Sequence, residues 1–136
     1  MLRIQVMPTQ RPTTIRYRTS LFEDVCELVE AEYSHDLQLD DIAKRIASSR
    51  RQLQRAFSEI GKTTFRDYLT AVRMTQAAEL LSHDRLTVRQ IARSVGYRQP
   101  AQFAKAFRRH HGEAPSEFRA SALRAGAGSP LVSQPA

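Results

Sequence analysis

An internal repeat constrains the fold of this chain more than any other feature of its sequence. Segment 39–46, LDDIAKRI, recurs as segment 88–95, VRQIARSV. Each copy is followed by a short polar break and then by three apolar residues, the last of which comes eleven residues after the second. These residues are Leu53, Phe57 and Tyr68 in the first copy and Phe103, Phe107 and Phe118 in the second. The offset between the copies is 49 residues in their first segments and 50 in their second, so the two turns differ by one residue.

Each copy has the pattern of two short helices joined by a tight turn. The Ile-Ala pair of the first helix and the Leu/Phe-x-x-x-Phe pattern of the second are expected to face each other, and the small alanine lets the two helices cross closely. Ser49 with Gln52, and Thr87 with Gln90, have the spacing of a capping box, which marks a helix start. Because both copies share their core positions, they predict two helix-turn-helix units rather than one chance hairpin.

The segment 64–81 lies between the copies and contains neither proline nor glycine. Its apolar residues fall on two opposite helical sides, Phe65, Leu69 and Val72 on one and Met74, Ala78 and Leu81 on the other. Such a helix packs between two neighbours, so we predict a linker helix with one unit on each side. Eighteen helical residues measure roughly 27 Å, and successive major-groove faces of B-DNA are about 34 Å apart, so such a rod could hold two reading helices in adjacent grooves.

The flanking segments complete the predicted organisation of an all-α chain. Residues 21–33 have an apolar stripe and an acidic face, which predicts a packing helix with Cys26 as a buried packing residue rather than a redox switch. The composition of the two ends predicts flexible tails. The predicted parts are a flexible basic arm (1–20), a first helix-turn-helix subdomain with its packing helix (21–63), the linker helix (64–81), a second helix-turn-helix subdomain (82–122) and a flexible tail (123–136).

The charges of the chain are unevenly distributed. The net charge is +7, yet eight of the fourteen acidic residues lie within residues 23–41, where there is no lysine or arginine. From residue 42 onward, seventeen lysines and arginines accompany only six acidic residues. A basic body with an acidic flank favours a polyanionic partner, of which nucleic acid is the most common.

Several other classes of protein are not supported by the sequence. No apolar run is long enough to cross a bilayer, and residues 1–20 lack the apolar centre of a secretory signal, so we expect a cytoplasmic protein without membrane association. The single cysteine and the spacing of the four histidines argue against a metal site. Neither a nucleophile elbow nor paired carboxylates in an apolar setting occur, so we predict no enzymatic activity and no cofactor.

The repeat is similar to the signature of the AraC/XylS family of bacterial transcription regulators. In the second copy the resemblance rests on Ile91-Ala92, Gly96-Tyr97, Phe103, Phe107, Gly112, Pro115 and Phe118-Arg119. Segment 53–57 (LQRAF) and the linker residues Arg73, Ala78 and Leu81 fit as well, so the resemblance covers about residues 21–119. One departure is that Gly61 comes one residue early, leaving Lys62 where the family usually has glycine.

The resemblance implies seven helices: a packing helix, two helix-turn-helix units joined by a long helix, and a short last helix. Most members of the family also carry an effector-binding or dimerisation domain. Unless the chain is a fragment of a longer protein, it looks like the stand-alone members, which bind asymmetric sites as monomers. The expected partner is therefore double-stranded DNA, and no small-molecule effector domain is expected in this chain.

The reading helix of the first unit is expected to begin after Ser49. The inward apolar positions leave Arg51, Gln54 and Arg55 facing outward. Arginine can bind guanine, and glutamine adenine, through two hydrogen bonds. The base-contacting positions of the family fall on Arg51 and Arg55, with Gln54 beside them; the alternative is a solvated basic face.

The reading helix of the second unit is expected to begin near Gln99 or Pro100. Its outward residues are Arg98, Ala101, Gln102 and Lys105, and the main contacts of the family fall on Ala101 and Lys105. Alanine can contact only a thymine methyl group, and lysine is a less directional donor than arginine. We therefore expect the first unit to carry most of the sequence specificity.

Phosphate contacts are expected from basic side chains and from helix starts, where backbone N–H groups favour an anion. The predicted phosphate-binding residues are Ser49, Arg50, Lys62, Thr63, Thr64, Arg108, Arg109 and Ser116. With about 6–10 phosphates engaged, affinity should fall steeply as salt concentration rises.

These patterns predict a sequence-specific transcription regulator that reads two adjacent major-groove segments of DNA as a monomer. One alternative is a non-specific architectural DNA binder, which would use the same charges. Another is a protein-interaction module that uses the acidic helix at 21–33. In a third arrangement that helix contacts RNA polymerase while the rest of the chain binds DNA.

Overall fold

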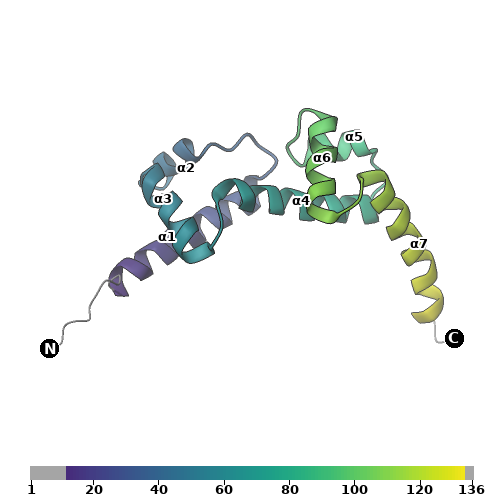
Figure 1. Ribbon diagram of the computed structural model, residues 1–136, viewed down its shortest axis with the longest axis horizontal. Helices are drawn as coiled ribbons and strands as arrows, with labels where there is room; N and C mark the ends of the chain where they lie inside the picture. The colour runs from purple at the N-terminus through teal and green to yellow at the C-terminus, as the bar shows by residue number, and fades with distance from the viewer. Residues whose placement is uncertain (1–11, 134–136) are drawn as a thin grey trace. The chain divides into compact units, whose positions relative to one another are not determined.

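The computed structural model describes residues 12–133, and the side chains of residues 12–126 (Figure 1). Over this range the chain forms seven α-helices, one π-helical turn and no β-strand, which confirms the predicted all-α fold. In chain order these elements are α1 (Pro12–Glu32), α2 (Leu39–Arg45), α3 (Arg50–Ala56), η2 (Phe57–Gly61), α4 (Phe65–His83), α5 (Val88–Ser94), α6 (Pro100–His111) and α7 (Pro115–Ser133). They belong to two compact units, of which the first contains the described residues 12–32 and 37–68 and the second contains 33–36 and 69–133.

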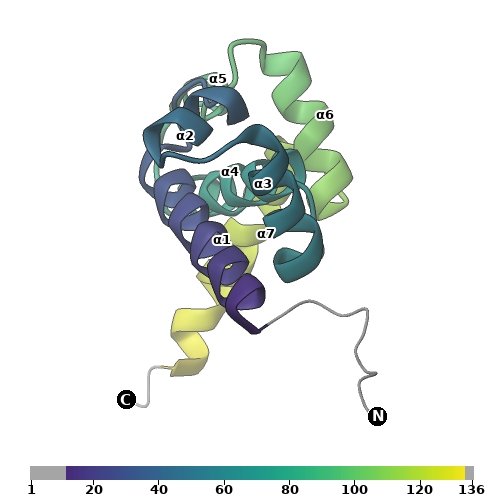
Figure 2. The same cartoon turned by 90° about the vertical axis from the view of Figure 1, so that its left-hand side faces the viewer.

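In the first unit, the helix-turn-helix formed by α2 and α3 is packed with α1 and η2 (Figure 2). Its buried apolar residues come from all four elements: Leu21, Val25, Val29, Leu39, Ile42, Ala43, Leu53, Ala56 and Phe57. The ring of Phe57 is the aromatic centre, with its centroid 5.0 Å from that of Phe22 and 5.9 Å from that of Tyr68. The first copy of the repeat therefore supplies the core that positions α3.

The second unit repeats this arrangement with α5 and α6, which pack with α4 and α7. Its buried core consists of Met74, Ala77, Leu81, Ile91, Ala92, Val95, Phe103 and Phe107. Phe107 occupies the position equivalent to Phe57, and its ring lies 5.3 Å from that of Phe118 and 5.8 Å from that of Phe103. The matching apolar positions of the two copies thus form matching cores.

The capping predictions hold fully in one copy and partly in the other. Thr87 and Gln90 form both hydrogen bonds of the capping box at the start of α5. At the start of α3, the Ser49 hydroxyl accepts a hydrogen bond from the Gln52 N–H at 3.1 Å, but no return bond from the Gln52 side chain is recorded there. Each of these caps satisfies an otherwise unpaired N–H group of a short helix.

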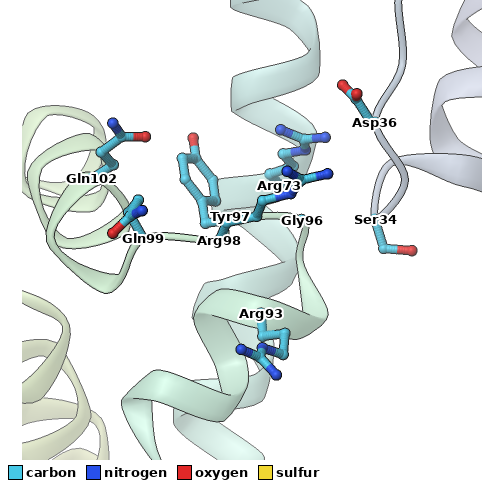
Figure 3. Close-up of a pocket in the computed structure, with 9 residues that line it drawn as sticks. All are labelled: Ser34, Asp36, Arg73, Arg93, Gly96, Tyr97, Arg98, Gln99 and Gln102. Carbon is cyan, nitrogen blue, oxygen red and sulfur yellow. The ribbon is translucent and has the colours of Figure 1, made fainter.

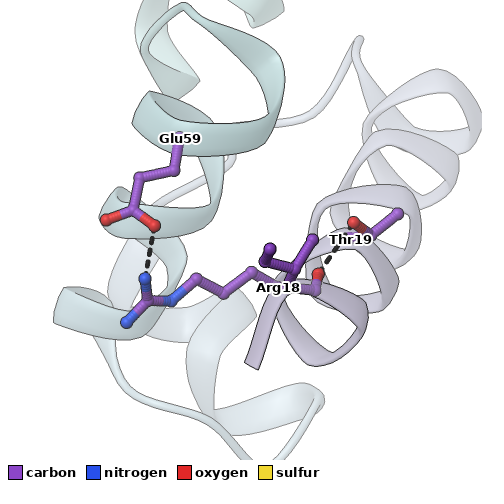
Figure 4. A network of polar contacts seen from close by, with 4 residues as sticks. Arg18, Thr19 and Glu59 are labelled. Carbon is purple, nitrogen blue, oxygen red and sulfur yellow. Dashed lines mark hydrogen bonds and ion pairs between the residues drawn. The ribbon is translucent and has the colours of Figure 1, made fainter. Parts of the chain in front are cut away.

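The prediction of a flexible arm over residues 1–20 is wrong for residues 12–20, which form the first turns of α1. Pro12 suits this helix start because its fixed φ is helical and it has no N–H to leave unpaired. Arg18 is buried and forms an ion pair with Glu59 of η2, while the Thr19 hydroxyl donates to the carbonyl of Ile15 (Figure 4). This long-range ion pair holds α1 against η2, which no local pattern could reveal. Residues 1–11 lie outside the described range.

Replacing Arg18 with alanine should lower the free energy of unfolding by about 2 kcal/mol, measured by urea denaturation. Breaking a fully buried pair costs about 3–5 kcal/mol, and the loss is smaller here because the Glu59 side chain is 33% exposed. Arg16→Ala is the matched control, because Arg16 is exposed on the same helix and should contribute less than about 0.5 kcal/mol. Equal losses in both variants would mean that the ion pair does not stabilise the unit.

Three other boundaries or environments differ from the predictions. The linker helix continues two residues beyond the predicted end, to His83. Helix α7 continues through most of the predicted flexible tail to Ser133; residues 134–136 lie outside the described range. Cys26 is half-buried rather than buried, and burial raises the pKa of its thiol, which disfavours the reactive thiolate.

Candidate nucleic-acid interface

Helix α3 presents one apolar face and one basic face. Leu53 and Ala56 are buried in the first unit, which leaves Arg51, Gln54 and Arg55 exposed on the opposite side. Arg51 and Arg55 are four residues apart, so their side chains project from the same face. Within residues 12–126, neither guanidinium forms a hydrogen bond or an ion pair with another residue. Both are therefore available to bind a ligand outside the chain.

Helix α6 presents a comparable but less basic face. Phe103 and Phe107 are buried, whereas Ala101, Gln102 and Lys105 are exposed. Arg98 is also exposed and lies just before Gln99, the residue that precedes the first helical residue Pro100. All residues predicted to read bases are therefore accessible, and their contacts with bases remain a prediction.

A groove in the second unit adds a residue that the sequence analysis did not select. It is lined by Ser34, Asp36, Arg73, Arg93, Gly96, Tyr97, Arg98, Gln99 and Gln102 (Figure 3). Arg93 is exposed in the last turn of α5 and shares the groove with Arg98 and Gln102, two predicted base-reading residues. A basic residue directly before the turn of a helix-turn-helix was the available signal for Arg93.

Four of the predicted phosphate-binding residues already have partners within the chain. The hydroxyls of Ser49 and Thr64 accept hydrogen bonds from the N–H groups of Gln52 and Asp67, at 3.1 and 3.0 Å. Arg50 lies 3.2 Å from a carboxylate oxygen of Asp40, and Arg108 lies 4.0 Å from one of Glu117. The remaining four are Lys62, Arg109 and Ser116, which are exposed, and Thr63, which is half-buried. To contact a phosphate, Arg50 or Arg108 would have to give up its ion pair with Asp40 or Glu117. Both pairs are exposed and contribute little to the stability of the fold.

Lys62 occupies a left-handed backbone position in the first unit. Its φ is +55°, and Gly112, at the equivalent place five residues after the repeat phenylalanine, has a φ of +86°. The neighbouring Gly61 is explained by packing, because a Cβ there would lie 2.4 Å from a carbon of the Phe22 ring. The early glycine of the sequence therefore makes room for Phe22, while the left-handed turn itself is made by lysine.

Replacing Lys62 with glycine should stabilise the first unit and weaken DNA binding. The left-handed conformation costs a non-glycine residue about 1–2 kcal/mol, partly offset by the greater backbone entropy of glycine in the unfolded chain. We expect the free energy of unfolding to rise by about 0.5–1 kcal/mol. If Lys62 contacts one phosphate, the slope of log affinity against log salt should decrease in magnitude by about 0.9.

The control for this prediction is Gly112→Ala, which makes the opposite change in the second unit. A Cβ at Gly112 would meet no atom within 4 Å, so only the backbone conformation opposes alanine there. The free energy of unfolding should therefore fall by about 1 kcal/mol in this variant. A Lys62→Gly variant that loses stability would contradict the explanation of the left-handed turn, and an unchanged salt slope would exclude the phosphate contact.

Two negative findings complete the description of the surface. Among the described residues, no group of three or more histidine, cysteine, aspartate or glutamate side chains is arranged to hold a metal ion. None of the helices described is both long enough and apolar enough to span a membrane.

Comparison with known proteins places this geometry in a family. A family model described as a helix-turn-helix domain matches residues 42–121. The Msm operon regulatory protein of Streptococcus mutans is 33% identical over 95 residues, which are 70% of this chain and 34% of that protein. The chain spans about a third of the length of the curated relatives it matches.

Solved structures agree with the family model. A transcriptional regulator from Chromobacterium violaceum, described as containing an AraC-type DNA-binding domain, is 27% identical and superposes with a TM-score of 0.73 over 89% of this chain and 99% of that one. The DNA-binding domain of AdpA, solved in complex with a target DNA, is 26% identical, with a TM-score of 0.70 over 74% of this chain and 90% of that one. The names of these relatives describe an operon regulatory protein, a transcriptional regulator and the DNA-binding domain of a transcriptional factor. The chain therefore belongs to the helix-turn-helix family of AraC/XylS-type DNA-binding transcriptional regulators.

Proposed function

We propose that this regulator binds DNA sequence-specifically, with α3 and α6 each reading a segment of major groove and the two segments being adjacent. The observation that carries the proposal is the face of α3, where Arg51, Gln54 and Arg55 are exposed on a helix anchored by buried Leu53. These are the residue types that bind guanine and adenine edges through paired hydrogen bonds. The target-DNA complex of the AdpA domain, which has a similar fold, supports the proposal.

The two reading helices are proposed to contribute unequally. Helix α3 offers two arginines and a glutamine, whereas the face of α6 offers Ala101, Gln102 and Lys105. Because lysine is a point charge and alanine has no polar group, the second unit is expected to supply affinity and weaker discrimination. The same basic residues in an architectural binder would give affinity without sequence preference.

We further propose that one copy of the chain binds one asymmetric site in the bacterial cytoplasm, and that α1 remains available to a protein partner. Glu23, Asp24 and Glu27 are exposed on α1, and their charges would repel DNA phosphates. RNA polymerase is the partner proposed for this acidic face in a transcription regulator. A protein-interaction module that does not bind DNA is the alternative use of the same surface.

Selection from randomised duplex DNA tests the proposal with the wild-type chain. The expected result is an asymmetric motif with two enriched blocks, whose separation measures the distance between the reading helices on DNA. Sedimentation of the complex on the selected duplex should show one chain per site. Tight, salt-sensitive binding without an enriched motif would favour the architectural function, and an absence of DNA binding would favour the protein-interaction module.

A further inference from the structure

The guanidinium of Arg73 links three parts of the second unit. Arg73 lies in α4 and is half-buried; its Nε donates to the carbonyl of Tyr33 and its Nη2 to the carbonyl of His35, both at 2.8 Å. Burial lowers the pKa of Arg73 from its ordinary value, yet arginine stays charged at any physiological pH. Two charge-assisted hydrogen bonds from a planar group fix both the position and the tilt of that group. The side chain is therefore a rigid support rather than a mobile surface arginine.

The turn between α5 and α6 rests directly on this support. A Cβ added to Gly96, whose φ is +104°, would lie 2.9 Å from the Cζ, Nε and Nη2 atoms of Arg73. The Cζ atom also lies 5.6 Å from the ring centroid of Tyr97, within the range of a cation–π contact. Figure 3 shows Arg73 beside Gly96 and Tyr97. The backbone of the turn can approach α4 this closely only because residue 96 has no side chain.

The first copy of the repeat contains the equivalent turn between α2 and α3, with Ala47 at the position of Gly96. Ala47 and Ser48 donate to the carbonyls of Lys44 and Ala43, and Gly96 and Tyr97 donate to the equivalent carbonyls of Arg93 and Ala92. The two turns thus share one hydrogen-bonding pattern, and Ala47 adopts it with a φ of +56°. A Cβ is therefore compatible with this hydrogen-bonding pattern when φ is near +56°. At Gly96 two effects oppose a Cβ: the φ of +104°, which strains any L side chain, and the contact with Arg73.

The turn of the second copy also needs more support than that of the first. It is one residue longer, and Gln99 makes no side-chain cap at the start of α6, whereas Ser49 caps α3. Tyr97 connects the turn to α6 through an edge contact with Phe103, with 5.7 Å between the ring centroids. A continuous series of contacts therefore runs from Arg73 through Tyr97 to the first turn of α6.

We infer that Arg73 is the positioning residue of the second reading helix. Its guanidinium, held by the carbonyls of Tyr33 and His35, fixes the Gly96–Gln99 turn and so orients the face of α6 toward DNA. The inference rests on the proposed function, because it holds that Arg73 supports the base discrimination proposed for Arg98, Gln102 and Lys105. Arg73 itself need not contact DNA.

Binding measurements on the selected site test the inference. We expect Arg73→Met to reduce the discrimination between intact and scrambled second blocks by about tenfold, and to leave discrimination at the first block within about twofold. Arg73→Lys should behave like Arg73→Met, because one ammonium group cannot replace the planar two-carbonyl contact. Unchanged discrimination at the second block in a folded Arg73→Met variant would overturn the inference. A wild-type chain without a two-block motif would instead refute the proposed function.

Amide hydrogen exchange supplies a readout that does not depend on DNA. The N–H of Tyr97 donates within the turn, and the equivalent N–H of Ser48 in the first copy is the internal control. Arg73→Met should accelerate exchange at Tyr97 by about tenfold while Ser48 stays within about twofold. A general loss of structure would accelerate both amides and would overturn the specific role.

A double-mutant cycle isolates the contact between Arg73 and Gly96. Gly96→Ala alone should reduce second-block discrimination as Arg73→Ala does, and the combined variant should lose little more than either single variant. Ala47→Gly, which alters the same position in the first copy, should leave both blocks within about twofold. Fully additive effects of Arg73→Ala and Gly96→Ala would show that the two residues act independently, contrary to the inference.

Discussion

Replacing Arg51 and Arg55 together with alanine is expected to abolish base discrimination in the DNA block read by α3. A good bidentate contact contributes about 1–3 kcal/mol of discrimination against the wrong base, so two lost contacts should reduce discrimination by about 30-fold or more. Both side chains are exposed on α3, and the core residues Leu53 and Phe57 are unaffected by the change. The free energy of unfolding should therefore stay within about 0.5 kcal/mol of the wild-type value.

Binding of the double variant to intact and scrambled versions of each block measures this effect. Arg66→Ala removes another exposed arginine of the first unit, and serves as the control for the loss of charge alone. It should weaken binding to all sequences equally, if at all. Preserved discrimination in the double variant, combined with its loss in Lys105→Ala, would reverse the proposed division between α3 and α6.

Truncation of Phe107 to alanine is expected to destabilise the second unit by about 3–5 kcal/mol, the usual cost of removing a buried phenylalanine ring. Phe107 is completely buried, and its ring contacts those of Phe103, His111 and Phe118. Removing it leaves a cavity at the contact between α6 and α7, where the neighbouring rings cannot all collapse. A loss of this size is a large part of the stability of a small domain, which is typically about 5–15 kcal/mol.

Thermal and urea unfolding measure this loss, and DNA binding reports its consequence. Leu123→Ala is the control, because Leu123 lies on α7 with 60% of its surface exposed and should cost less than about 0.5 kcal/mol. At temperatures where the variant is partly unfolded, the second DNA block should be recognised poorly. A loss below about 1 kcal/mol for Phe107→Ala would show that the second core does not depend on the repeat phenylalanine.

The repeat phenylalanines illustrate how far sequence periodicity predicts this protein. Phe57 and Phe107 were expected to face inward from their spacing alone, and both are fully buried. Periodicity succeeds here because a helix has a fixed number of residues per turn, so spacing along the chain determines which face a residue occupies. The same rule identified Arg51 and Arg55 as outward-facing residues of α3.

Residues whose surroundings come from distant parts of the chain were predicted poorly. Residues 12–20 were assigned to a flexible arm, because nothing near Arg18 in the sequence shows that Glu59 will pair with it. The groove around Arg93 is assembled from three separate segments, so its composition does not follow from any local pattern. The early Gly61 is visible in the sequence, but its reason is the ring of Phe22, a residue in another helix.

The sequence by itself determined the helical periodicity, the two helix-turn-helix units and the basic faces of α3 and α6, because these follow from local spacing and residue type. Only the tertiary structure decided which polar groups became rigid supports and which stayed free. Arg73 and Arg51 are both arginines on predicted helices, yet one is held by two backbone carbonyls and the other is unpaired among the described residues. The difference arises from burial and from partners some forty residues away, which become neighbours only when the chain folds.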